Sequence, residues 1–278
     1  MTLSGNSVAV VTGAASGIGR AVAHRLAQEG IAGIAISDID ETGLKETAAG
    51  LGLYGLPVST HVLDVSDLEA VTRFKDEVLA RHARVTHLIN NAGVGLIGTF
   101  EHVSIEDFKW LVGINFYGVV YCTKVFLPTL LEQERAHIVN VSSVFGLIAP
   151  AEQTAYAASK FAVRGFTESL RHELSDTSVS VSCVHPGGVK TNIARNSRVG
   201  EGTPAEWKPQ GVKFFDKVAR TTPEKAAEVI VKGIKSRNPR ILIGSDARGI
   251  SLFSRMFPRN YLRIIERLAG HKMSLRKL

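Results

Sequence analysis

The sequence predicts an α/β fold in which a mainly parallel sheet of seven strands is covered by helices on both faces. Two observations carry this prediction. Short apolar runs recur along the chain, and stretches with helical periodicity separate them. The first apolar run is followed by a Gly-rich turn that opens a helix. Continuous apolar runs are typical of parallel strands, because such strands are buried on both faces.

The strands and several helix starts can be placed in order. The predicted strands cover residues 8–12, 34–37, 58–63, 87–90, 138–141, 179–184 and 241–243. Ser66 begins a capping box, and Ser104 begins a close relative with Asp in the last position. Thr222 precedes Pro223, which suits the first position of a helix. Residues 191–221 are rich in glycine and proline, so we expect a long loop with short helical turns at most.

The composition limits the classes of protein to which the chain can belong. The chain has 278 residues, of which 45% are hydrophobic and 21% are charged, as in a soluble globular domain. Cys122 and Cys183 lie in apolar patterns and are predicted as buried thiols rather than as a disulfide. We expect no metal site, because no Cys/His spacing suits one. With no signal sequence and no long apolar run, we expect a cytoplasmic location.

A Gly-rich motif follows the first predicted strand. Gly13, Gly17 and Gly19 enclose Ser16 and Ile18, and a helix begins within this segment. Glycines allow a tight turn and a close approach of the backbone to a pyrophosphate, and the free N–H groups of a helix start favour negative charge. The spacing is G-x-x-x-G-x-G rather than G-x-G-x-x-G, so the motif alone is also consistent with an ordinary turn.

A serine, a tyrosine and a lysine follow at spacings that suit catalysis. Tyr156 and Lys160 are four residues apart and share one face of a helix. An ammonium beside a phenol stabilises the phenolate and lowers its pKa from about 10. Such a tyrosine can exchange a proton with an alcohol oxygen. Ser143 lies just past a predicted strand, where open α/β sheets bind their ligands. Taken alone, the Tyr–Lys spacing also fits a surface pair.

Together these motifs resemble those of the short-chain dehydrogenase/reductase superfamily in its single-domain form. The resemblance covers about residues 5–245 and implies a Rossmann-like fold with NAD(P)-dependent oxidoreductase activity. Supporting motifs lie between and after the first two, namely Asp64-Val65, Asn90-Asn-Ala-Gly93, Asn115 and Pro186-Gly187.

The resemblance also implies the roles of individual residues. The catalytic set would be Ser143, Tyr156, Lys160 and Asn115. The cofactor would contact Gly13, Ser16, Gly17, Ile18, Gly19, Asp38, Asp64, Val65, Asn90, Ala92, Gly93, Tyr156, Lys160, Pro186, Gly187, Val189 and Thr191. Ser143 is preferred to Ser142 because its separation from Tyr156 is the usual one in the family. For Asp64, a purely helix-capping role stays open.

Asn115 lies on an apolar helical face, where an unpaired amide would cost about 1–3 kcal/mol. The resemblance implies that it holds a water molecule that contacts Lys160 and extends a proton relay. A core asparagine bonded to backbone is the alternative.

Asp38 ends the second predicted strand, where a carboxylate can accept a hydrogen bond from the adenosine ribose and repel a 2′-phosphate. Neither Ser16 nor Ile39 supplies a cation for that phosphate. We therefore expect NAD in preference to NADP. Asp38 could also simply begin a turn with Asp40.

The sequence thus favours an NAD-dependent oxidoreductase that interconverts an apolar secondary alcohol, such as a steroid or another lipid, and its ketone. The alternatives are an NADP-dependent carbonyl reductase and a non-catalytic nucleotide-sensing scaffold on the same fold. The resemblance implies a homodimer or homotetramer that pairs through two long helices.

The positive charge is concentrated at the end of the chain. The net charge is +7, and residues 248–278 contain eight basic residues and one acidic residue, so residues 1–247 are neutral overall. We therefore expect a catalytic domain over 1–247 and a basic amphipathic extension over 248–278. Nucleic-acid binding is not expected, because the extension lacks interleaved aromatic and basic residues.

Two interpretations of the extension stay open. Pro258 interrupts it and predicts two short helices, the second beginning at Pro258. The favoured interpretation is a helical pair packed on its own domain or on a neighbouring subunit. The other is a peripheral membrane foot, with arginines on anionic headgroups.

Overall fold

The computed structural model describes residue 3 and residues 5–269. Its main sheet has seven strands, all parallel, in the order β3-β2-β1-β4-β6-β7-β9. The strands are β1 (Val8–Thr12), β2 (Gly33–Asp38), β3 (Val58–Val62), β4 (His87–Asn90), β6 (Ala136–Val141), β7 (Val179–Pro186) and β9 (Arg240–Ile243). The predicted α/β fold and all seven strands are confirmed.

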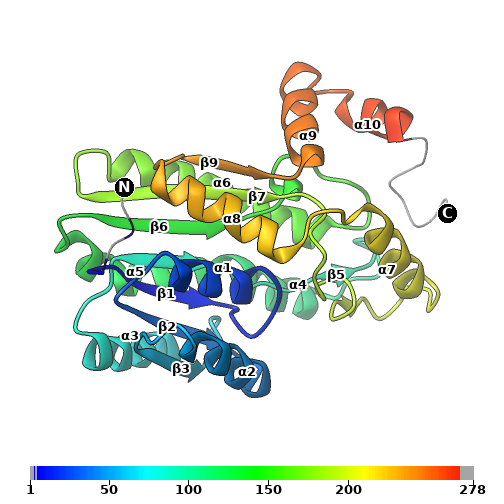
Figure 1. Cartoon of the computed structure of the whole chain (residues 1–278). Coiled ribbons are helices and arrows are strands. Elements are labelled where there is room, and N and C mark those ends of the chain that lie inside the picture. Colours follow the sequence, from blue (N-terminus) through cyan, green and yellow to red (C-terminus); the bar gives the residue numbers. More distant parts are fainter. Residues whose placement is uncertain (1–2, 4, 270–278) are drawn as a thin grey trace.

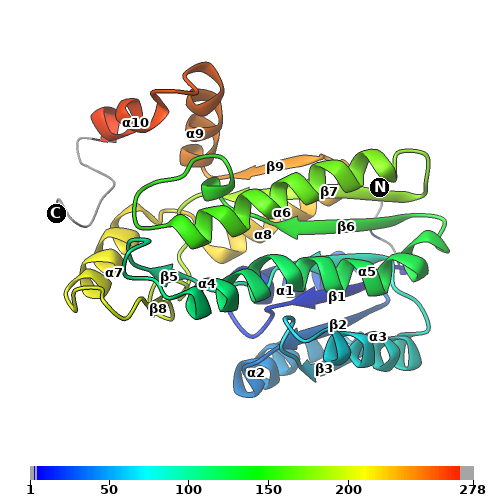
Figure 2. The same cartoon turned by 180° about the vertical axis from the view of Figure 1, so that it is seen from behind.

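Helices cover the two faces of the sheet (Figures 1 and 2). One face carries α1 (Gly17–Gln28), α2 (Glu41–Gly52) and α8 (Pro223–Lys235), whose apolar side chains share a core cluster with β1 and β2. The other face carries α3 (Leu68–His82), α5 (Gly118–Leu131) and α6 (Thr154–Glu173). Cys122 and Cys183 are buried free thiols, as predicted.

Two of the three predicted helix caps are present. The Ser104 side chain accepts from Asp107 N at the start of α4 (Ile105–Val112), and the Thr222 side chain accepts from Lys225 N at the start of α8. The capping box at Ser66 is wrong. Asp67 is the N-cap of α3, because its Oδ1 accepts from Glu69 N and Ala70 N, while the Ser66 hydroxyl donates to Asp64 instead.

A long helical segment runs through α4, a π turn (Gly113–Tyr117) and α5. By length and hydropathy alone, Ile105–Leu131 could cross a membrane. In the structure, α5 is a core helix instead, since Cys122, Phe126 and Leu130 are buried against the sheet and α3. The buried face of α5 therefore accounts for part of the apolar character of this segment.

Residues 191–221 are more ordered than expected. They contain β8 (Arg198–Val199), which pairs in parallel with β5 (Leu96–Ile97), and α7 (Trp207–Val218). The expectation of short turns at most was wrong, because Pro209 lies in the first turn of α7. The N–H groups of a first turn have no intrahelical acceptor, so a proline is tolerated there.

The C-terminal extension is a helical pair that projects from the body (Figure 1). It consists of α9 (Ser245–Met256) and α10 (Tyr261–Ala269). The expected boundary after residue 247 therefore falls inside α9. Two helices are present as predicted, but Pro258 lies in the turn between them and the second helix begins at Tyr261.

Candidate active site

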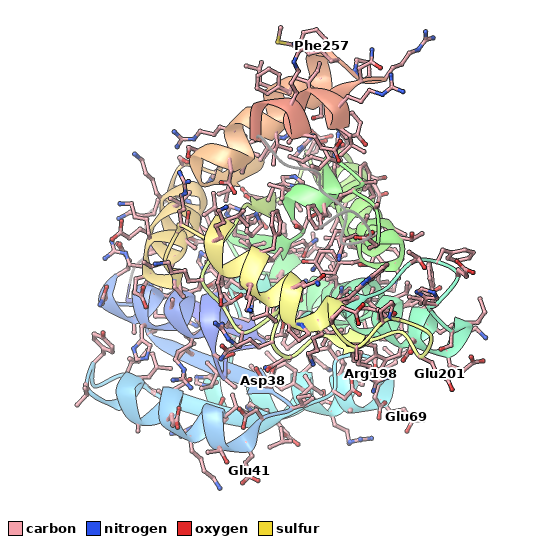
Figure 3. All side chains as sticks on the ribbon, turned by 90° about the vertical axis from the view of Figure 1, so that its right-hand side faces the viewer. Asp38, Glu41, Glu69, Arg198, Glu201 and Phe257 are labelled. Atoms are coloured by element: carbon pink, nitrogen blue, oxygen red, sulfur yellow. The ribbon has the colours of Figure 1, made fainter. Side chains whose placement is uncertain are left out.

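The candidate site lies at the carboxyl edge of the sheet. From β1 the chain adds β2 and β3 on one side and then crosses back to add β4 on the other side of β1. The strand order therefore reverses between β1 and β4. A ligand crevice is expected outside the strand ends at such a point. Figure 3 looks onto this edge, with Asp38 at the end of β2 and Arg198 on β8.

The Gly-rich turn is closely packed and lacks room for side chains. A Cβ at Gly13 would lie 2.7 Å from Ala92 Cα, and one at Gly19 would lie 2.1 Å from Gly13 O. Gly13 and Gly17 also have positive φ angles, which favour glycine. Ser16 is exposed and its side chain does not cap α1, so the first N–H groups of this helix stay available for an anion.

Asp38 ties the end of β2 to the Gly-rich turn. Its Oδ2 accepts from Ala15 N at 3.0 Å, and its Oδ1 accepts from Asp40 N at 3.2 Å. Each carboxylate oxygen can accept a further hydrogen bond, so Asp38 fits a ribose hydroxyl as well as the turn. Sequence reasoning missed Arg20, which lies beside this turn but is already bonded to Gly43 O and Glu46.

The loop after β4 is joined to β1 by hydrogen bonds. The Thr12 hydroxyl accepts from Asn91 N and from Ala92 N, both at 3.1 Å, while the Asn91 amide donates to Thr12 O and Gly13 O. The Asn90 amide is buried and donates to Thr123 and Asn140, away from the edge. Contacts from Asn90 to a ligand would therefore come from its backbone.

Asp64 and Val65 differ in exposure. Asp64 is exposed, and its Oδ1 accepts from both the backbone N and the hydroxyl of Ser66. Val65 is buried against Gly118. The alternative that Asp64 mainly organises the turn before α3 thus has direct support, and its contact with adenine stays a prediction.

The segment after β7 approaches the start of α1. A Cβ at Gly17 would lie 3.1 Å from Thr191 Cγ2, and a cavity of about 310 Å³ opens beside Thr191. Pro186 and Val189 are buried, while Asp246 of α9 accepts from Gly188 N at 2.7 Å. The structure therefore gathers the Gly-rich turn and Thr191 at one place.

Two elements, α6 and the segment after β6, bring Ser143, Tyr156 and Lys160 together. Tyr156 and Lys160 lie in the first turns of α6, and Lys160 Nζ is 5.7 Å from the centre of the Tyr156 ring. Lys160 Nζ also donates to Val141 O at 3.1 Å. Ser143 follows β6 and is hydrogen-bonded to Tyr156. The Ser142 hydroxyl instead donates to Lys160 O, so it is occupied inside the fold.

Burial moves the pKa values of this pair in opposite directions. It raises the pKa of Tyr156 to about 12, although the Ser143 hydrogen bond opposes the rise, and it lowers the pKa of Lys160 to about 8. The expected lowering of the tyrosine pKa is wrong for this geometry. The ammonium is held by Val141 O over the ring, and desolvation outweighs its attraction for the phenolate.

Asn115 lies within the π turn and is fully buried. Its Oδ1 accepts from Val94 N at 2.8 Å, and its Nδ2 donates to Val94 O at 3.0 Å and to Ser159 at 3.3 Å. A Cβ at Gly93 would lie 3.1 Å from Asn115 Oδ1 and 3.3 Å from Lys160 Nζ, so these groups meet at one point. The side chain thus fixes the loop at Val94, and its part in a proton relay stays a prediction.

Sequence reasoning missed one residue beside this set. His185 of β7 is fully buried, and its Nδ1 lies 3.0 Å from Ser143 O. Burial lowers its pKa to about 4, so the ring is neutral near pH 7. A carbonyl oxygen can only accept, so Nδ1 carries the proton and donates. A histidine just before Pro186-Gly187 was the available signal.

Comparison with known proteins agrees with this geometry. Residues 7–202 match the family model described as short chain dehydrogenase. A protein of Mycobacterium tuberculosis named "Putative oxidoreductase SadH" is 42% identical over 261 residues, which are 93% of each chain. "Dehydrogenase/reductase SDR family member 7B" of Xenopus tropicalis is 31% identical over 90% of this chain and 81% of its own.

Solved structures extend the similarity to the fold. A short-chain dehydrogenase/reductase from Burkholderia phymatum in complex with NAD has a TM-score of 0.83 and 31% identity, over 99% of this chain and 98% of that one. An alcohol dehydrogenase from Thermococcus sibiricus complexed with 5-hydroxy-NADP has a TM-score of 0.72 and 27% identity, over 85% and 95%. These proteins share the fold and bind nicotinamide dinucleotides of both kinds.

Proposed function

The chain belongs to the short-chain dehydrogenase family of oxidoreductases, and we propose that it uses NAD to interconvert an apolar secondary alcohol and its ketone. The strongest support for this proposal is the arrangement of three side chains. Ser143, Tyr156 and Lys160 come from two elements and converge at the carboxyl edge of the sheet, beside a turn suited to a pyrophosphate. A non-catalytic scaffold on this fold would have no need of that convergence.

The cofactor fits the residues at this edge. The Gly-rich turn and the start of α1 would hold the pyrophosphate, and Asp38 would accept from the adenosine ribose. The nicotinamide supplies and accepts the hydride when bound. The preference for NAD over NADP rests on the negative charge of Asp38, on the absence of a cation at Ser16 and Ile39, and on the engagement of Arg20 with Glu46.

The protein's own residues would then handle the proton. With a pKa of about 12, the Tyr156 hydroxyl is protonated near neutral pH and can donate to a ketone oxygen as this oxygen becomes an alkoxide. Ser143 would donate a hydrogen bond to the same oxygen and orient it. Lys160 would place its ammonium beside the phenol, so that the phenolate formed on proton transfer is stabilised. Oxidation of the alcohol uses the same groups in reverse.

An apolar substrate is proposed from the surroundings of Tyr156. Leu96, Val144 and Leu147 are buried close to the site, and the Phe145 ring lies edge-on to Tyr156 at 6.1 Å between centres. The class of steroids and other lipid alcohols is compatible with it.

A cytoplasmic homodimer or homotetramer is part of the same proposal. Large apolar side chains are exposed along the two long helical segments, including Tyr117, Leu131 and Phe161. Exposed apolar surface of this kind is typical of a subunit interface.

Replacing Tyr156 with phenylalanine tests the proposal. Tyr156→Phe keeps the ring and removes the transferable proton, so turnover should fall by about 10²–10⁴-fold or more while NAD binding persists. Reduction of NAD by a panel of secondary alcohols, followed by absorbance, measures turnover of the native protein. A native protein that binds NAD but acts on no alcohol or ketone would favour the scaffold, and a variant with unchanged turnover would overturn the role of Tyr156.

A further inference from the structure

The outer side of the C-terminal extension combines exposed apolar side chains with unpaired positive charges. We propose that α9 and α10 dock this side onto an anionic lipid surface, with apolar side chains in the interface and arginines on the headgroups. The docking goes beyond the proposed function and does not depend on it. Delivery of a lipid-soluble substrate, argued last, does depend on it.

The inner side of the extension is fixed to the body by specific contacts. Ala247 and Ser251 of α9 are buried, and Arg240 of β9 donates to the Ser251 hydroxyl at 3.1 Å. The Tyr261 hydroxyl of α10 accepts from Ala149 N at 3.3 Å. In this orientation the opposite side of the helical pair faces outward.

The outward side carries apolar side chains that no described residue covers. Leu252 and Met256 are 55% and 58% exposed and are separated by one helical turn, and Phe257 follows them at 40%. Figure 3 shows Phe257 at the outermost point of the molecule, away from the sheet. The Phe253 ring stacks on Phe257 at 6.4 Å between centres. Side chains this large would be costly to leave in water on a short projecting helix.

The arginines around this apolar group make no ion pair within residues 5–269. They are all exposed, namely Arg248, Arg255, Arg259, Arg263 and Arg267. On the body, by contrast, several arginines pair with carboxylates, among them Arg20, Arg25, Arg164 and Arg195. The extension carries the entire positive excess of the chain, so its partner is expected to be anionic.

The combination of side chains favours lipid over the other anionic or apolar partners. A nucleic acid would accept the arginines but would leave Leu252 and Met256 in water. A second copy of this chain would bring its own arginines against these, which repel. An anionic bilayer surface satisfies both sets, because acyl chains accept the apolar side chains and phosphates accept the guanidinium groups.

Flotation with vesicles tests the docking. The full-length protein should float with vesicles of phosphatidylcholine and phosphatidylserine at low salt, and it should be released by high salt and by omission of phosphatidylserine. Arg255→Gln with Arg259→Gln should weaken partitioning by about fivefold or more per charge removed. Leu252→Ser with Met256→Ser and Phe257→Ser should abolish the remainder.

Matched variants elsewhere control for charge and hydropathy. Arg81→Gln with Arg84→Gln removes the same charge from the far side of the body, and Leu53→Ser removes an apolar side chain that is 88% exposed. Both control proteins should float like the native protein. Circular dichroism and NAD binding show that every variant is folded.

Several results would overturn the docking. The native protein could fail to float with anionic vesicles at low salt, or the arginine variant could float as well as the controls. Light scattering could show instead that the apolar variant changes the oligomeric state, which would make a second copy the occupant. Retention on a DNA duplex without flotation would make the partner a nucleic acid.

Docking would also place a membrane beside the substrate site. Tyr261 is bonded to Ala149, in the segment between Ser143 and Tyr156, so the extension adjoins the apolar surroundings of the catalytic set. We therefore expect the native protein to turn over an alcohol dissolved in anionic vesicles faster than the arginine variant does. With a water-soluble alcohol the two should be equal. Flotation without any turnover would refute the proposed function and leave the docking intact.

Discussion

Asp38 holds the Gly-rich turn through a hydrogen bond and is also proposed to select NAD through its negative charge. A substitution that keeps the hydrogen bond and removes the charge can test the second role alone. Its Oδ2 accepts from Ala15 N, so an alanine at this position would loosen the Gly-rich turn as well as remove the charge. Asp38→Asn keeps an acceptor for Ala15 N. Combined with Ile39→Arg, it offers a cation to a 2′-phosphate.

We expect the native protein to bind NAD more tightly than NADP, and the Asp38→Asn, Ile39→Arg variant to shift the ratio of the two dissociation constants towards NADP by about tenfold or more. A differential of about 1.4 kcal/mol is sufficient for that change. Isothermal titration with both cofactors measures it. Tighter binding of NADP by the native chain would contradict the assigned role of Asp38.

His185 is predicted to position Ser143 without touching the substrate. Its Nδ1–H donates to Ser143 O from a buried, neutral ring. His185→Leu removes this donor, and loss of about 1 kcal/mol should lower kcat by about fivefold with little change in KM. His185→Asn replaces the donor and should restore most of kcat. Equal kcat in the two variants would show that the histidine has a packing role alone.

At the scale of elements, the start of α3 offers a direct comparison of two neighbouring caps. Asp67 accepts from Glu69 N and Ala70 N, whereas the Ser66 hydroxyl donates to Asp64. Asp67→Ala should therefore lower the free energy of unfolding by about 0.5–2 kcal/mol, as loss of an N-cap does. Ser66→Ala should have a smaller effect. Urea denaturation of both variants measures the difference. A larger loss of stability in Ser66→Ala than in Asp67→Ala would show that Ser66 is the N-cap, as the sequence suggests.

The same element shows why some boundaries escape prediction. Ser66 and Asp67 are both good caps, and the choice between them depends on the path of the chain from β3. The π turn at Gly113–Tyr117 is similar, because no local residue pattern requires it. It places Asn115 against Val94, a contact between distant segments of the chain. Likewise, pairing of β5 with β8 joins segments about a hundred residues apart, which periodicity cannot detect.

For the whole molecule, most of the fold was predictable, because its strands are continuous apolar runs and turn or helix-capping residues separate these runs from the helices. The proximity of the candidate catalytic residues was also largely predictable, since Tyr156 and Lys160 share a local helix and Ser143 follows a strand; their roles stay predictions. The pKa values were not predictable in this way. The direction for Tyr156 depends on how deeply the phenol is buried and on Val141 O holding the ammonium, and both arise only from packing.

Buried histidines should make the whole fold sensitive to acid. Burial lowers the pKa of His87 to about 4, of His137 to about 3 and of His185 to about 4. In the unfolded chain each has a pKa near 6.5. Between about pH 6.5 and pH 4 the unfolded chain therefore binds more protons than the folded one. Stability is fully present above this window and is lost as the pH falls through it.

Each histidine should contribute a slope of about 1.4 kcal/mol per pH unit within that window. Urea denaturation at a series of pH values measures the free energy of unfolding and hence the slope. His137→Gln should reduce the slope of the unfolding free energy against pH by about 1.4 kcal/mol per pH unit, the contribution of one histidine. This holds whatever the substitution does to stability at pH 7. His172→Gln, at an exposed position, is the matched control variant. A native slope near zero between pH 6 and about 4.5 would show that these rings become protonated inside the fold.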